Sequence, residues 1–138
     1  MSIHDGTEPV ADDERLYRRI PVSMGWYDDQ GLSPEAFRPR RDEETGISVF
    51  RAKYKSIQDA ARGMSKQGYY IAVLLAGDLR NANMEVVPRP LPNDPGHAEL
   101  PDLTCHNRSE PMTMTRMGRL TDLAMQVEGP FHSALPSE

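Results

Sequence analysis

The chain has 138 residues, of which 38% are hydrophobic and 27% charged, and its formal net charge is −5. This length suits a single domain with one core, and the acidic balance disfavours nucleic acid as a partner, since such binding depends on clustered positive charge. With Cys105 as the only cysteine there is no internal disulfide, and no stretch approaches the roughly 20 apolar residues of a membrane helix. We therefore expect a soluble, cytoplasmic protein with no membrane segment.

Residues 1–13 are polar and acidic and show no apolar period. Segments of this kind bury too little apolar surface to fold on their own. We therefore expect a disordered acidic tail over 1–13, a single domain over 14–130 and a second tail over 131–138.

The first regular element is expected at residues 15–20, where apolar and polar residues alternate as in a strand. Pro21 ends it, because proline cannot donate to a strand ladder. Residues 22–46 are expected to form a long covering loop. It contains Trp26 and one short helical start, in which Ser33 is the cap and Pro34 the first helical residue.

The longest apolar run covers residues 69–76, with a glycine on either side. We interpret it as a strand buried on both faces at the centre of a sheet. A second strand is expected at 47–52 and a helix at 56–64, which has Ser56 as its cap. Further strands are expected at 84–87 and 97–100, separated by a proline-rich loop that is stiff.

The last helix is expected at 110–128, since apolar residues recur there at steps of three and four. Gly129 and Pro130 are typical of a helix end. The predicted fold is therefore α+β: a small mixed or antiparallel sheet of four to five strands, with the 56–64 and 110–128 helices packed on one face.

The segment 93–99 is the strongest candidate for chemistry. Its rigid loop delivers His97 to the start of a strand, where a histidine can act as a base or a hydrogen-bond donor to an anion. Asp94 or Glu99 could orient the imidazole ring. The competing interpretation is a structural histidine that satisfies loop carbonyls.

Arg18 or Arg19 on the first strand, Ser48 on a middle strand and a late Glu99 follow one another in the chain. This order resembles that of ADP-ribosyltransferase-type enzymes. The resemblance implies that the arginine and serine hold NAD and that the glutamate supports the developing ribosyl cation. The serine-rich triplet of that family is absent here.

Other signatures of chemistry are missing from the sequence. The histidines and Cys105 show no spacing typical of a zinc site, so we expect no metal and no cofactor. Neither a nucleophile elbow, a phosphate loop nor a dinucleotide glycine pattern occurs.

Two functions remain open, and whether the chain is an enzyme is undecided at this stage. The first is a non-catalytic accessory or protein-binding module, a bacterial subunit that works with a larger partner; flexible methionines on and beside the last helix favour it. The alternative is a small enzyme acting on a phosphate-bearing nucleotide such as NAD. Its catalytic residues would be His97, Glu99 and Ser48, and its substrate-binding residues Arg18, Arg19, Asp94 and Trp26.

Overall fold

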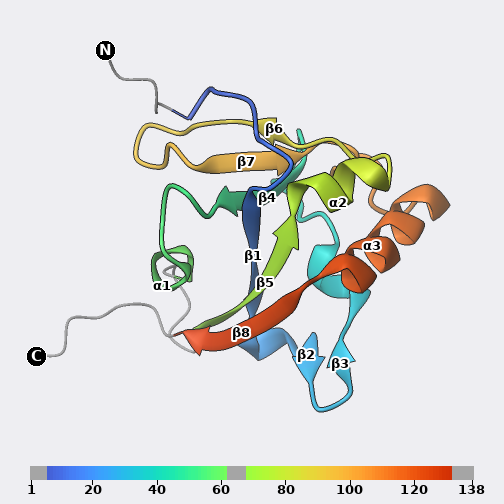
Figure 1. Ribbon diagram of the computed structural model, residues 1–138. Coiled ribbons are helices and arrows are strands. Elements are labelled where there is room, and N and C mark those ends of the chain that lie inside the picture. The colour runs from blue at the N-terminus through green and yellow to red at the C-terminus, as the bar shows by residue number, and fades with distance from the viewer. Residues whose placement is uncertain (1–5, 62–67, 132–138) are drawn as a thin grey trace, which may run out of the picture.

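The computed structural model describes residues 6–61 and 68–131. Its centre is a six-stranded antiparallel sheet with the order β6-β7-β4-β1-β5-β8 (Figure 1). The strands are β1 (Arg15–Pro21), β4 (Ile47–Arg51), β5 (Tyr69–Leu75), β6 (Val87–Pro88), β7 (His97–Leu100) and β8 (Gln126–Phe131).

One long helix and several short elements accompany the sheet. They are α1 (Ile57–Ala60), α2 (Ala76–Asn81), α3 (Pro111–Leu123), the 3₁₀ turns η1 (Val22–Met24) and η2 (Pro34–Phe37), and a small hairpin of β2 (Tyr27–Asp28) and β3 (Gly31–Leu32). The expected caps are in place, since Ser33 and Ser56 both accept from the first turn of their helices. Over the described residues, no helix has the length and apolar character needed to cross a bilayer.

The strand predicted at the centre of the chain is confirmed over Tyr69–Leu75, and the next residue already begins α2. Because neighbouring strand residues point to opposite faces, Ala72 and Leu74 join the main core with α2, α3 and η2, whereas Ile71 joins a smaller cluster with α1. Both faces of β5 are therefore covered.

The predicted α+β class and the antiparallel sheet are confirmed, but the strand and helix counts are wrong. The sheet has six strands and only one main helix. The described part of the predicted 56–64 helix, α1, packs on Phe50 and Ile71, on the face opposite α3 (Figure 1). The two helices thus do not share a face.

The predicted helix at 110–128 ends at Leu123, and residues 126–131 form the edge strand β8 instead. Val127 pairs with Ala72, and Met125 donates its backbone N–H to the carbonyl of Val73 at 2.8 Å. Without β8 this edge of β5 would leave its backbone groups unpaired. The need to pair the edge of β5 comes from a distant segment, so the helical spacing of apolar residues at 110–128 does not indicate a strand there.

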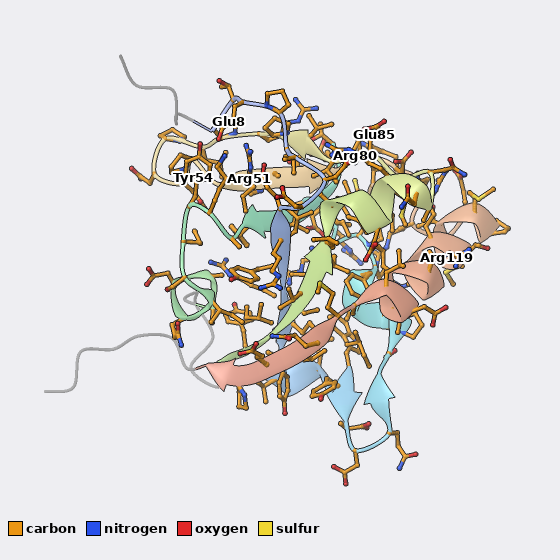
Figure 2. All side chains as sticks on the ribbon, in the orientation of Figure 1. Glu8, Arg51, Tyr54, Arg80, Glu85 and Arg119 are labelled. Carbon is orange, nitrogen blue, oxygen red and sulfur yellow. The ribbon has the colours of Figure 1, made fainter. Side chains whose placement is uncertain are left out.

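The N-terminal residues that the structure describes pack against the body instead of forming the expected tail. Val10 is buried, and Arg51, fully buried, donates to the carbonyls of Gly6, Glu8 and Pro9 and to the carboxylate of Glu14. Figure 2 shows Glu8, Arg51 and Tyr54 gathered at this end of the molecule. Residues 1–5 and 132–138 lie outside the described residues, so the start of the first predicted tail and nearly all of the second are not described.

Candidate functional site

The candidate site begins where two neighbouring strands separate. β1 pairs with β5 along its whole length, from Arg15 to Pro21, but with β4 only at Leu16 and Tyr17. Beyond these pairs the side chain of Arg18 bridges the two strands and donates from Nη1 to the carbonyl of Ser48 at 3.1 Å. The sheet therefore opens between β1 and β4, and Arg18 spans the opening.

Arg18 has no donor left for a ligand. Its Nε–H points to the carbonyl of Ala36 at 3.1 Å, and its Nη groups point to both carboxylate oxygens of Glu43 and to the carbonyls of Ser48 and Arg38. A guanidinium has five N–H groups, and all five face protein acceptors. Arg18, which we predicted to bind the substrate, therefore uses its guanidinium N–H groups within the protein, where they connect β1 to the segments around the opening.

Glu43 is the buried partner of this arginine and lies 2.8 Å from its Nη1. Burial on its own would raise the pKa of the Glu43 carboxyl, but the charge and hydrogen bonds of Arg18, with backbone N–H groups of Arg40 and Ser48, outweigh burial and lower it. The pair is thus an internally neutral unit, and it adds no net charge to the opening beside it.

A cavity of about 250 Å³ lies in this opening, mostly on the face away from the main core. Strands β1, β4 and β7 and the loop before β7 contribute its walls. The lining residues are Arg18, Arg19, Arg40, Ser48, Phe50, Leu91, Asp94 and His97. Five of the predicted site residues therefore come together here.

The first free cation of the cavity is Arg19. Its Nε–H donates to the carbonyl of Ala60, and its guanidinium carbon lies 4.4 Å from the ring centroid of Phe50. Burial lowers the pKa of the Arg19 guanidinium, and the neighbouring charge of Arg40 acts in the same direction, whereas Tyr69 and Asp94 oppose it. No described residue accepts a hydrogen bond from its two Nη groups, so both remain available to a ligand.

Arg40 supplies a second cation at the rim. It is exposed, and within residues 6–61 and 68–131 its side chain forms no ion pair or hydrogen bond. In the sequence Arg40 lies beside the acidic residues 42–44, within the segment expected to be a covering loop. The fold instead turns Glu43 inward to Arg18, which leaves Arg40 facing the cavity without that carboxylate.

His97 and Ser48 form a hydrogen-bonded pair on the cavity wall. Nδ1 of His97 lies 2.9 Å from the carbonyl of Arg89, and Nε2 lies 3.1 Å from Oγ of Ser48. A carbonyl only accepts, so Nδ1 carries the hydrogen and a neutral imidazole then presents Nε2 as an acceptor to the serine hydroxyl. This is the arrangement of a base and the hydroxyl it can deprotonate.

The residues just before His97 hold its backbone in place. Gly96 precedes it where a Cβ would lie 2.6 Å from Cβ of Tyr54, so the close approach requires glycine. The proline-rich loop closes on itself through paired backbone bonds between Leu91 and Asp94. His97 itself is only 7% exposed.

Asp94 lines the same cavity. One carboxylate oxygen accepts from Lys55 at 3.0 Å, while the other, Oδ1, is buried and has no hydrogen-bond partner in the described structure. A buried acceptor without a donor is costly.

Two of the predicted site residues do not line the cavity. Glu99 is held by Arg89 at 3.2 Å and by the hydroxyl of Thr45 at 2.6 Å, and Trp26 packs at the margin of the main core. Arg40, Phe50 and Leu91 also line the cavity. Phe50 shares a face with Ser48 by strand alternation, whereas no periodicity in the sequence indicates Arg40 or Leu91. In the described residues no three histidine, cysteine, aspartate or glutamate side chains gather as a metal site would require.

Comparisons with protein-family models, curated proteins and solved structures gave no match for this chain. The site is therefore classified by its own geometry. It is a small cationic cavity in a split antiparallel sheet, with a hydrogen-bonded serine and histidine in its wall.

Proposed function

We propose that this protein is a small binding domain whose ligand carries a phosphate group. The observation that supports it is the pair Arg19 and Arg40, two cations on one cavity, neither of which forms an ion pair with a described residue. The one carboxylate in the lining, Asp94, is paired with Lys55. Arginine is suited to bidentate contact with phosphate. An anion between the two guanidinium groups would relieve their mutual repulsion.

The cavity also limits the size and chemistry of the ligand. Its volume of about 250 Å³ lies just below the roughly 300–1,000 Å³ usual for drug-sized ligands. A sugar phosphate, or the phosphorylated part of a nucleotide, suits it better than a fully enclosed dinucleotide.

Calorimetric titration with inorganic phosphate and with ribose 5-phosphate tests this function. We expect both to bind, the sugar phosphate more tightly, and affinity to fall as salt is raised. Arg40→Ala should weaken binding about tenfold to a hundredfold, since a hydrogen bond to a charged group contributes about 1.5–3 kcal/mol. Arg119→Ala, an exposed arginine on α3, is the matched control. Absence of binding, or equal losses in both variants, would contradict the proposal.

The NAD-transferring alternative has less support from the geometry. It needs a carboxylate beside the bound ribose, and Glu99 is turned to Arg89 and Thr45 instead. It also needs a free arginine on β1, and at position 18 every N–H group already faces a protein acceptor. Arg19 is the only one of the two that could serve.

A role as an accessory subunit is the second candidate. Met112 and Met114 on α3 and Met125 just after it are 57%, 45% and 47% exposed, and exposed methionines are common at adaptable protein interfaces. If they contact a partner, Met112→Glu should abolish co-purification of one specific protein from the native host. Met24→Glu, at a methionine 52% exposed on η1, should leave that co-purification unchanged.

A further inference from the structure

We propose that Ser48 is a nucleophile and His97 its general base, and that together they cleave a phosphodiester or phosphoanhydride bond of the ligand bound in the cavity. This inference rests on the phosphate-binding function proposed above and deepens it. Phosphate binding alone would not require a hydrogen bond between Ser48 and His97.

The two side chains are held by the sheet and not by loops. Ser48 lies on β4, an interior strand between β1 and β7, and His97 begins β7. Ser48 is opposite Glu99 in the register and Phe50 is opposite His97, so serine and histidine are diagonal neighbours on one face. Sites built on strands hold such a geometry more closely than sites built on loops.

The histidine is also oriented by its surroundings. The carbonyl of Arg89 fixes the hydrogen on Nδ1, as a third group does in hydrolytic serine–histidine systems. The ring of Phe50 packs edge-to-face against the imidazole, with centroids 5.9 Å apart and an interplanar angle of 65°. These two contacts leave Nε2 directed at Oγ of Ser48.

The proposed reaction balances in bonds and protons with only Ser48, His97, the ligand and water. Oγ of Ser48 attacks phosphorus as its proton passes to Nε2 of His97, and the bond from phosphorus to the leaving oxygen breaks as that oxygen takes the proton. Water then attacks the phosphoserine, its proton passes through His97 to Oγ, and Ser48 is regenerated. The net reaction adds one water across one P–O bond.

The cations supply what this reaction needs besides the nucleophile. Attack on phosphorus keeps negative charge on the non-bridging oxygens, which must be held while the attacking and leaving oxygens exchange. The free Nη groups of Arg19 and the side chain of Arg40 line the cavity that contains Ser48. Substrate binding and transition-state stabilisation thus fall to the same two arginines.

A neutral alkyl fluorophosphonate tests the nucleophile directly, because it carries a reactive phosphorus and needs no anion site. We expect time-dependent labelling of the full chain, with loss of fluoride and a mass increase that tandem mass spectrometry places on Ser48. Ser23 and Ser109, both exposed, serve as internal controls in the same digest and should stay unlabelled. Ser48→Ala should abolish the label.

His97→Asn tests the base, since its amide can still donate to the carbonyl of Arg89 but cannot take the proton. Labelling of Ser48 should slow about a hundredfold, within the usual contribution of general-base catalysis of about 10²–10⁴. An equal rate in the two proteins would overturn the proposal. So would a wild-type protein that binds phosphate yet is never labelled, and in that case the binding function would stand. Labelling of Ser48 without phosphate binding would support the nucleophile and contradict the binding function.

Discussion

Arginines with identical chemistry have opposite roles in this protein, and the difference lies in how many of their N–H groups are used. Arg18 and Arg51 are buried and each has five N–H groups directed at protein oxygens. Arg19 and Arg40 keep donors that no described residue accepts. The first two hold the fold together, and the last two are available for a ligand.

Replacement of Arg18 should therefore damage the fold more than any change at the cavity rim. Arg18→Met leaves Glu43 buried without its partner, and breaking a buried ion pair costs about 3–5 kcal/mol. Urea denaturation should show this loss in the free energy of unfolding, while Arg40→Met should change it by less than about 0.5 kcal/mol. The double variant Arg18→Met, Glu43→Leu should recover much of the stability, and its failure to do so would contradict the ion-pair argument.

The same pair should make stability depend on pH. Because the pKa of Glu43 is lowered in the folded protein, its contribution is fully present above the ordinary carboxyl value of 4.5 and is lost as pH falls through the lower folded value. We expect the free energy of unfolding of the wild type to decrease steadily below about pH 5. In Glu43→Gln that decrease should be shallower, and identical slopes would rule out this source of acid sensitivity.

At the scale of elements, the sequence predicts the helices, strands and caps that depend on neighbouring residues. It does not predict a strand that depends on pairing with a distant segment. The apolar run of β5, the proline start of α3 and the caps at Ser33 and Ser56 are all encoded by neighbours in the chain. β8 is not, because Val127 continues the helical spacing from Leu123 and only the open edge of β5 requires a strand there. A six-stranded sheet with one main helix follows from that pairing.

The candidate site was predicted in part for the same reason. The stiff loop before His97 is visible in the sequence, and so is the alternation that puts Ser48 beside Phe50. The partner of Arg18 is not, since Glu43 lies 25 residues away in a segment that resembles a solvated loop. Arg40 was not predicted as a cavity residue for the same reason. Its side chain lacks a carboxylate partner only because Glu43 points inward and pairs with Arg18.

The helix α3 provides a direct test of which of its methionines belong to the core. Met117 is 1% exposed and packs in the main cluster, whereas Met112 is 57% exposed on the same helix. Met117→Ala should lower the free energy of unfolding by about 2–5 kcal/mol, and Met112→Ala by less than about 0.5 kcal/mol. Thermal and urea unfolding of the two variants measure this contrast, and similar losses in both would contradict the packing of α3.

On the scale of the whole molecule, the N-terminal segment connects parts that are distant in the chain. Arg51 holds residues 6–14 against the end of β4, and the carbonyls of Asp12 and Glu14 accept from the first residues of α2 at 2.8 Å and 3.0 Å. Figure 2 shows Arg80 of α2 on this side of the molecule too, and it lies 2.7 Å from Asp12. The segment thus joins both halves of the sheet.

Arg51→Ala should release this segment. We expect rapid cleavage within residues 6–14 in limited proteolysis, together with a fall in the melting temperature, because Glu14 loses a buried partner. Arg80→Ala is the control, since its pair with the exposed Asp12 lies near the surface and such pairs contribute about 0–1 kcal/mol. Equal cleavage in both variants would show that Arg51 is not what secures the segment.

The early separation of β1 from β4 makes Arg18 a spacer. Arg19 lies on β1, whereas Ser48 and His97 lie on β4 and β7, so the hydrogen bonds of Arg18 connect one wall of the cavity to the other. Under the proposed function we expect Arg18→Lys, which keeps the charge but has fewer N–H groups, to alter the gap between these walls. The measurement is the ratio of affinities for inorganic phosphate and ribose 5-phosphate, and an unchanged ratio would show that Arg18 does not set this gap.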